Sequence, residues 1–191
     1  MDTKNNNQNN KVEGKQENNV ATEIKDFFKT LVISIIIVFF ITTFLFKPIR
    51  INGDSMYPTL HDQSIGLAGV ITKNLGIQRF DIVTVKLVEK NETLIKRVIG
   101  LPNETIEFKN DVLYIDGKVV NEDFLDEEYV ATYSQFTNDF KITLNEDEYF
   151  LMGDNRPNSS DSRYYGPFSK DEISTSKVLI IFPFNRIGVI E

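Results

Sequence analysis

Hydrophobic and polar positions divide the chain into three stretches with different patterns. Residues 1–26 form a polar start, rich in Asn, Gln, Lys and Glu and without apolar periodicity, which predicts a disordered tail. Residues 27–46 read FFKTLVISIIIVFFITTFLF, with Lys29 as their only charge. Twenty apolar residues suffice for a helix to cross about 30 Å of hydrocarbon, so this stretch predicts a transmembrane helix. Residues 47–191 return to a mixed pattern and are long enough for roughly one domain.

Two other structures could explain the apolar stretch, and both fit it less well. A cleaved secretory signal has an apolar core of about 7 to 15 residues, followed by small residues at the cut site. Here the stretch ends in Thr42-Thr43-Phe44-Leu45-Phe46, which is too bulky to be cut. A buried helix of a soluble core would carry a polar face at helical period, and this stretch has none. We therefore expect residues 27–46 to anchor the chain.

The charges that flank the anchor predict its orientation. Five lysines precede or open the stretch, whereas only Lys47 and Arg50 occur in the twenty residues after it. Since cytoplasmic flanks are enriched in Lys and Arg, we expect a single-pass protein of the cell membrane with a cytoplasmic N-terminus and an extracytoplasmic domain over 47–191. Ser55 lies nine residues past Phe46. An extended chain of that length keeps it within roughly 30 Å of the bilayer.

Short β-like runs dominate residues 47–191, and helical periodicity is nearly absent. The runs cover residues 64–70, 81–88, 93–99, 105–108, 112–115, 118–120, 149–152 and 177–182. Asp116-Gly117 is a strong hairpin signal because both residues tolerate a positive φ. The pattern predicts a mainly β domain of packed or coiled antiparallel sheets. We expect residues 105–144, which include this hairpin, to form a smaller inserted subdomain.

Composition excludes several classes of function. The net charge of −7 arises entirely after residue 46, because residues 1–46 contain five Lys/Arg and five Asp/Glu. An acidic surface repels phosphates, so nucleic acid is not an expected partner. Cysteine is absent and His61 is the only histidine, which argues against a catalytic zinc. The acidic stretch 122–128 lacks the ligand spacing of a calcium loop. We therefore expect neither a metal nor another cofactor.

Three segments carry residues that could perform chemistry, and the first surrounds Ser55. In this segment Gly53 permits a sharp turn and Pro58 fixes φ, so Ser55 could sit at a rigid bend with its hydroxyl exposed and its N–H unpaired. That geometry suits a nucleophile and half of an oxyanion hole. An ordinary turn has the same composition, so the segment alone leaves both interpretations open.

The second segment, residues 92–102, predicts a strand with one cation on each face. Lys96 and Arg97 point to opposite faces, and their neighbours on both sides are apolar. Such a strand is central and buried, so Lys96 would be desolvated and its pKa lowered, as a lysine base at neutral pH requires. Arg97 cannot deprotonate and must find a carboxylate. The alternative is a lysine that extends its ammonium into water.

The third segment, Gly153 to Arg163, has no large apolar side chain and is dense in hydroxyls, amides and charges. It follows the apolar run 149–152 directly and could orient a base through Ser or Asn hydrogen bonds, although a surface loop has the same composition. A histidine triad is a weaker interpretation. His61, next to Asp62, would have to fold back over the intervening residues to reach Ser55, so we interpret it as a turn residue.

Together these segments resemble those of the type I signal peptidases, the Ser-Lys peptidases that remove signal peptides from secreted proteins. The order also matches: an uncleaved anchor, Gly-Asp-Ser-Met-x-Pro-Thr-Leu from Gly53, Lys-Arg-Val-Ile-Gly-Leu-Pro from Lys96, and Gly-Asp-Asn-Arg-x-Asn-Ser-x-Asp-Ser-Arg from Gly153. The likeness runs from the anchor to about Gly166, and the single anchor with a short middle insertion is similar to the Gram-positive branch.

The resemblance implies a signal-peptidase-like fold and cleavage of a membrane-bound substrate after a small-x-small signature such as Ala-x-Ala. The implied partners are the signal peptides of exported preproteins, the lipid bilayer and the protein-export machinery. Ser55 matches the nucleophile, Lys96 the general base, and Ser159 the serine whose hydroxyl helps to orient the lysine. Further matches are the substrate-binding positions Met56, Leu60 and Ile95, and the supporting pairs Asp154 with Arg97 and Asp161 with Arg163.

Two positions depart from the family pattern. Gly53 stands where some members carry a serine whose hydroxyl completes the oxyanion hole, so the hole would depend on the Ser55 N–H and on a further donor that the sequence does not identify. Pro157 replaces an acidic residue seen in some relatives.

The implied mechanism has neutral Lys96 accept the proton of Ser55, which attacks the scissile carbonyl; water activated by the same lysine then hydrolyses the acyl-enzyme. Three other functions stay open. A self-cleaving repressor-type Ser-Lys peptidase would be soluble and carry a DNA-binding segment. A catalytically silent, membrane-anchored signal-peptide-binding protein need not keep both residues. A purely structural anchored β-domain would leave the lysine in a buried strand unexplained.

Overall fold

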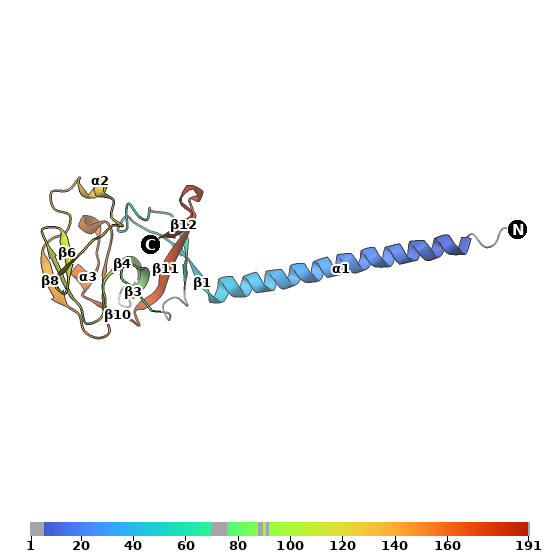
Figure 1. Cartoon of the computed structure of the whole chain (residues 1–191), viewed down its shortest axis with the longest axis horizontal. Coiled ribbons are helices and arrows are strands. Elements are labelled where there is room, and N and C mark those ends of the chain that lie inside the picture. Colours follow the sequence, from blue (N-terminus) through green and yellow to red (C-terminus); the bar gives the residue numbers. More distant parts are fainter. Residues whose placement is uncertain (1–5, 70–75, 88–89, 91, 191) are drawn as a thin grey trace. The chain divides into compact units, whose positions relative to one another are not determined.

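The computed structural model describes residues 6–69, 76–87, 90 and 92–190, without the side chains of 6–21, 43–44 and 189–190. It divides into two units, Met1–Phe44 and Leu45–Glu191. The first contains one helix, α1 (Asn6–Phe44) (Figure 1). This helix runs through most of the stretch that we expected to be a disordered tail, of which residues 1–5 lie outside the described part. Once a helix exists, each added residue gains a hydrogen bond at little cost, so polar residues can prolong it.

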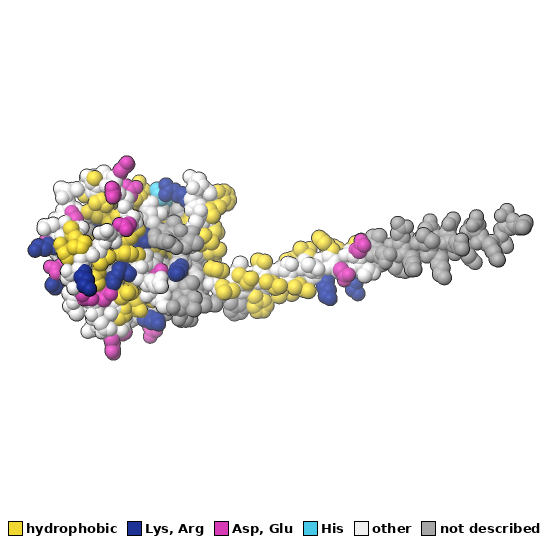
Figure 2. Space-filling model, viewed as in Figure 1, with side chains coloured by type: hydrophobic (Ala, Val, Ile, Leu, Met, Phe, Trp, Pro, Cys, Tyr) yellow, Lys and Arg dark blue, Asp and Glu magenta, His cyan; other side chains and the backbone are white. Residues whose placement is uncertain are grey.

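The described side chains of α1 expose large apolar groups to the surroundings (Figure 2). Thirteen of them are between 43% and 64% exposed: Ile24, Phe27, Phe28, Leu31, Val32, Ile33, Ile35, Ile36, Ile37, Val38, Phe39, Phe40 and Ile41. Among the residues that the structure describes, no helix combines enough length and apolar character to cross a membrane.

The second unit is built around an eight-stranded antiparallel sheet. Its strands follow the order β1 (Phe46–Arg50), β2 (Ile65–Gly69), β11 (Ile173–Phe182), β3 (Ile82–Leu87), β4 (Glu92–Gly100), β9 (Glu148–Met152) and β10 (Phe168–Ser169), and β12 (Gly188–Ile190) pairs with β11 outside this path. β4 thus has a neighbour on each side, β3 and β9. The prediction that the strand carrying Lys96 and Arg97 is central is confirmed.

A second, four-stranded sheet lies at the other end of this unit (Figure 1). Its order is β7 (Lys118–Val120), β6 (Val112–Ile115), β5 (Thr105–Lys109) and β8 (Phe140–Thr143), again antiparallel. The predicted hairpin joins β6 to β7, with φ of 50° at Asp116 and 77° at Gly117. Short helical turns complete the unit: α2 (Glu127–Val130), η3 (Arg156–Asn158), α3 (Ser162–Tyr165) and η4 (Phe184–Arg186).

Three apolar clusters hold the unit together, and β4 contributes to all of them. Val98 is buried in a cluster with β3 and β9, and Ile99 is buried in a cluster that joins the large sheet to the small one. Ile95 packs against a third cluster, which contains residues from β2 and from the connection before it. Since each packed side chain restrains its own backbone, β4 is a rigid platform for Lys96 and Arg97.

The mainly β, antiparallel class is confirmed, and most predicted runs correspond to strands. The ends of two runs, Val70 and Val88, lie outside the described residues. Four strands were not predicted: β1, β8, β10 and β12. β1 contains Pro48 and lies at the end of the sheet order, where the missing N–H of proline is tolerated. The other three have two to four residues, too few for an alternating pattern to be recognised.

Candidate active site

The fold brings the three candidate segments to one place on the large sheet. Ser55 lies in the connection between β1 and β2, and Lys96 lies in β4. β4 pairs with β9 in a register that sets Arg97 opposite Met152. The loop that follows Met152, from Gly153 to Arg163, therefore leaves the sheet beside Lys96.

Lys96 is buried, and its amine is directed at Ser55. Its side chain is 2% exposed, and Nζ donates to Ser55 Oγ at 2.8 Å and to the carbonyl oxygen of Ile95 at 3.0 Å. Burial lowers the pKa of Lys96 from 10.5 to about 8; Asp161 and Asp154 act in the opposite direction. The predicted burial and lowered pKa of this lysine are confirmed. At such a pKa the neutral amine, which can accept a proton, is populated near neutral pH.

Arg97 points to the other side of β4 and is fully enclosed. Its Nε and Nη2 donate to the two carboxylate oxygens of Asp154 at 3.0 and 2.8 Å, its Nη1 donates to the carbonyl oxygen of Phe80 at 3.0 Å, and its guanidinium lies 4.0 Å from the ring centroid of Phe124. Thr59 Oγ1 donates to the same carboxylate at 2.6 Å. Asp154 thus ties the segment around Ser55 to the strand that carries Lys96.

Gly153 lies where two backbone segments come closest together. A Cβ at this position would lie 2.3 Å from the carbonyl oxygen of Ser55 and 2.3 Å from Ser159 Oγ. The N–H of Gly153 donates to Asp161 Oδ2 at 3.0 Å, and Asp161 is paired with Arg163 at 2.8 Å. Burial alone would raise the pKa of Asp161, but the hydrogen bonds from Arg163 and Gly153 hold that pKa below its usual range. This pair keeps the loop close to Ser55.

Ser159 lies in the same loop, but its hydroxyl does not contact the lysine amine by a hydrogen bond. Ser159 Oγ is buried and meets no geometric criterion for a hydrogen bond in the described part of the chain, but it lies close enough to Asp161 to help lower the pKa of that carboxyl. Lys96 Nζ bonds Ser55 and Ile95 instead. A buried hydroxyl without a partner is unfavourable by about 1 to 3 kcal/mol.

The three residues matched to substrate binding belong to one apolar region. Met56 and Leu60 are each 1% exposed within the third cluster, and Ile95 packs against it while remaining partly exposed.

His61 makes an edge-to-face contact with Tyr57, with ring centroids 4.9 Å apart, and burial lowers the pKa of His61. His61 is therefore packed on an aromatic ring within the turn.

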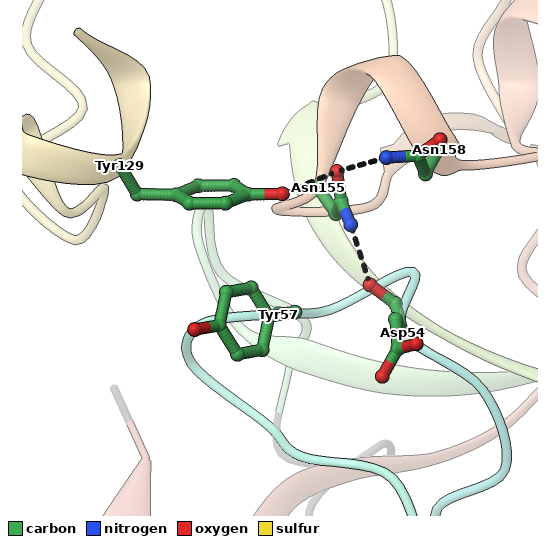
Figure 3. A pocket seen from close by; sticks show the side chains of 5 residues that line it. All are labelled: Asp54, Tyr57, Tyr129, Asn155 and Asn158. Carbon is green, nitrogen blue, oxygen red and sulfur yellow. Dashed lines mark hydrogen bonds between the residues drawn. The ribbon is translucent and has the colours of Figure 1, made fainter. Parts of the chain in front are cut away.

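A polar pocket of about 580 Å³ opens next to Ser55. Figure 3 shows its lining residues: Asp54, Tyr57, Tyr129, Asn155 and Asn158. Asn155 Nδ2 donates to the carbonyl oxygen of Asp54 at 3.0 Å, and the hydroxyl of Tyr129 donates to Asn155 Oδ1 at 3.1 Å. A side chain from α2 is thereby linked to the residue that precedes Ser55.

Several of these contacts were not predicted from the sequence. Arg156 is buried and forms an ion pair with Glu122. The acidic stretch 122–128, for which the sequence predicted no role, therefore makes a structural contact. The polar composition of the loop pointed to Asn155 only as one of several amides. No local pattern connects Glu122 or Tyr129 to a loop that follows them by more than twenty residues, because their proximity depends on the packing of the two sheets.

A buried lysine amine within hydrogen-bonding distance of a serine hydroxyl, on a rigid antiparallel β scaffold, is the arrangement of a serine peptidase that uses lysine in place of histidine. Comparison with known proteins agrees. The chain belongs to the signal peptidase family, peptidase S26, whose profile matches residues 24–182. It is a serine endopeptidase of this family, and its reaction is the removal of signal peptides from preproteins.

Individual relatives resemble the chain over most of its length. It is 40% identical over 178 residues to signal peptidase I P of Bacillus subtilis subsp. natto, which covers 90% of this chain and 96% of that protein. It is 38% identical over 171 residues to signal peptidase I S of Bacillus subtilis strain 168, with 86% and 92% covered. A crystal structure of a signal peptidase I from Enterococcus faecalis is 36% identical, with a TM-score of 0.50, and covers 53% of this chain and 96% of that one.

Proposed function

We propose that Ser55 is the nucleophile and Lys96 the general base of this signal peptidase. The observation that carries the proposal is the 2.8 Å hydrogen bond between Lys96 Nζ and Ser55 Oγ, made by an amine whose pKa is lowered to about 8. Neutral Lys96 accepts the proton as Ser55 Oγ attacks the scissile carbonyl carbon, and the ammonium then protonates the leaving amine. Water deprotonated by the same amine hydrolyses the ester and frees Ser55.

The remaining site residues hold this pair and the substrate. Once Ser55 is acylated, its ester oxygen is a poorer acceptor, and the buried hydroxyl of Ser159, which lies beside Asp161, can replace it in orienting Lys96. The pairs Asp154 with Arg97 and Asp161 with Arg163 support the loop. Met56, Leu60 and Ile95 belong to one apolar cluster, of which Ile95 is the partly exposed member, and we place the small side chains of a small-x-small cleavage site against this cluster.

We also propose that the chain is anchored in the cell membrane by residues 27–46, with its N-terminus in the cytoplasm and the β unit outside. The support is the run of twenty residues with one charge and the lysine bias before it. This proposed span includes Thr43 and Phe44, whose side chains lie outside the described part. Preproteins emerge at this membrane, so we place the enzyme beside the export machinery.

An apolar patch on the β unit favours the same location. Phe182, Phe184 and Ile187 are 47%, 77% and 58% exposed, and Ile65, which pairs with Phe182 across the sheet, is 39% exposed. The rings of Phe182 and Phe184 are in edge contact, with centroids 5.6 Å apart. Contiguous exposed apolar side chains of this kind mark a surface that contacts a membrane or a partner.

Cleavage of a preprotein with an Ala-x-Ala site, in lipid or detergent across a pH series, tests the dyad and the specificity together. We expect the full-length wild type to cut at that site, and Ser55→Ala and Lys96→Ala to reduce the rate by at least about 10³-fold. The rate should rise with pH to a plateau, with a midpoint near 8, because the neutral amine is the base. Cutting that survives Lys96→Ala would exclude the lysine mechanism. A folded wild type without activity would favour a silent signal-peptide-binding protein.

A further inference from the structure

Within the described residues, the backbone N–H of Ser55 is free to bind a developing oxyanion. Gly53 has no hydroxyl, and its own N–H is occupied, since it donates to Asp62 Oδ1 at 2.8 Å. The N–H of Ser55 makes no hydrogen bond to any other residue in the described part of the chain. If Ser55 is the nucleophile, this N–H is the donor nearest to the oxygen of the scissile carbonyl, and its direction determines how well that oxygen is stabilised.

Asn155 fixes the backbone on both sides of this N–H. Its side-chain Nδ2 donates to the carbonyl oxygen of Asp54 at 3.0 Å, and its backbone N–H donates to the carbonyl oxygen of Ser55 at 3.0 Å. The peptide bond between Asp54 and Ser55 is trans, so the Ser55 N–H points opposite to the Asp54 carbonyl. A donor that holds the carbonyl on one side therefore sets the direction of the N–H on the other.

Asn155 is itself held in one orientation (Figure 3). Its side chain is 3% exposed, and its Oδ1 accepts hydrogen bonds from the Tyr129 hydroxyl at 3.1 Å and from Asn158 Nδ2 at 3.2 Å. With two donors on Oδ1, only Nδ2 is available for the Asp54 carbonyl, so the amide cannot reverse without losing all three bonds. The resulting chain of hydrogen bonds runs from α2 to the peptide before Ser55.

We propose that Asn155 is a positioning residue that orients the Ser55 N–H for the oxyanion, with Tyr129 holding Asn155 in place. As Ser55 Oγ bonds to the scissile carbon, the carbonyl π electrons move to its oxygen, and the preset N–H meets this negative charge without reorganisation. The inference depends on the proposed role of Ser55. In this role the polar residues that line the pocket beside Ser55 contribute to transition-state stabilisation. The apolar residues proposed to bind the substrate do not make this contribution.

The variants Asn155→Ala and Asn155→Asp test this role in the full-length protein. Both lack the Nδ2 donor, and the aspartate keeps the size and the acceptor oxygen. We expect kcat to fall by about 10- to 100-fold, less than the 10²–10³-fold typical of losing an oxyanion donor outright, because the N–H is misaligned rather than removed. KM should change by less than about threefold, because the neutral carbonyl of the bound substrate interacts more weakly with the Ser55 N–H than the oxyanion of the transition state does.

Two readouts separate positioning from a general loss of structure. A substrate-like peptide ending in an aldehyde forms a tetrahedral adduct with Ser55, so its Ki should rise in proportion to the loss of kcat/KM across the variants. The midpoint of the pH–rate profile of Asn155→Ala should stay near that of the wild type, because this variant leaves Lys96 and the charges around it untouched. Tyr129→Phe should give a smaller loss in the same direction. The control is Asn145→Ala, an exposed asparagine in another turn, which should leave kcat unchanged.

The outcomes distinguish this inference from the proposed function. If Ser55→Ala is inactive but both Asn155 variants keep kcat within threefold of the wild type, the positioning role is wrong and the dyad stands. A loss confined to KM, or an aldehyde that binds all variants equally, also overturns the role. If Asn155→Ala does not fold, the isosteric Asn155→Asp decides by the same criteria. Activity that persists in Ser55→Ala overturns both proposals.

Discussion

At the scale of single residues, the site contains a group that the fold holds in an unfavourable environment. Protonated Lys96 is buried, and its pKa of about 8 against 10.5 corresponds to roughly 3 kcal/mol that opposes folding below pH 8. Between pH 8 and 10.5 the unfolded chain binds this proton and the folded chain does not, so the contribution of Lys96 to stability improves as pH rises.

Lys96→Met removes the charge and keeps most of the volume, so it should stabilise the fold while abolishing activity. We expect a gain of about 2 to 3 kcal/mol at pH 7 that shrinks towards zero by pH 10, when wild-type Lys96 has lost its proton. Denaturant unfolding of both proteins in the same detergent, at several pH values, measures the difference and cancels the other titrating groups. A gain that does not depend on pH would contradict the lowered pKa.

Gly153 gives the second prediction at this scale. Its Cβ-free backbone allows Ser55 and Ser159 to approach from the same side, so Gly153→Ala should displace one of them. We expect activity to fall by at least about 10²-fold, since small displacements of reacting groups are costly, with a destabilisation of about 1 to 3 kcal/mol from the overpacking. Gly117→Ala lies in the exposed hairpin turn, where a Cβ meets no atom within 4 Å but the φ of 77° strains an alanine, so this variant should lose some stability and keep its activity. An active Gly153→Ala protein would show that this contact can relax.

At the scale of elements, the joint between β4 and the polar loop depends on one buried ion pair. Asp154→Ala would leave the Arg97 guanidinium enclosed without a counter-charge, which should cost about 3 to 5 kcal/mol. Thr59→Ala removes only one hydrogen bond to the same carboxylate and should cost about 1 kcal/mol. Unfolding curves of the two variants test this order. Equal losses would show that the carboxylate matters through Thr59 rather than through Arg97.

The same elements show what the sequence could and could not predict. The alternating residues of β4 identified a central strand with a desolvated Lys96, because the two-residue period of a strand and the apolar character of its two faces can be recognised within the segment itself. The turn at Asp116-Gly117 was likewise local. Strand β8 and the contact between Asn155 and Asp54 were not predictable, since each exists only after segments far apart in the chain have packed. The sequence of a short strand or of a polar loop does not indicate which distant segment it will contact in the folded unit.

At the scale of the whole molecule, the small sheet is joined to the site by charge as well as by the apolar core. Arg156, in the loop after β9, is 1% exposed and pairs with Glu122, which follows β7. Glu122→Ala would bury an unpaired guanidinium beneath the active site, so we expect a loss of about 3 to 5 kcal/mol and reduced activity at 37 °C. Melting temperature and residual cleavage of the Ala-x-Ala preprotein report the two effects.

An exposed pair in the same sheet provides the control. Lys141 and Glu107 lie 2.8 Å apart, with side chains 62% and 32% exposed. Water and salt screen such a pair, so Glu107→Ala should change the stability by less than about 1 kcal/mol. If Glu107→Ala and Glu122→Ala lowered the stability by the same small amount, the ion pair between Arg156 and Glu122 would make no measurable contribution to it.

The buried amine of Lys96 also makes substrate capture a proton-coupled event. With a pKa near 8, roughly nine-tenths of the free enzyme carries the proton at pH 7. A bound apolar peptide would exclude further water from Ser55 and Lys96 and disfavour the ammonium still more. Each peptide bound would then release part of a proton to the medium. In calorimetry at pH 7 the apparent binding enthalpy would differ between buffers in proportion to their ionisation enthalpies, and this dependence would vanish in Lys96→Met.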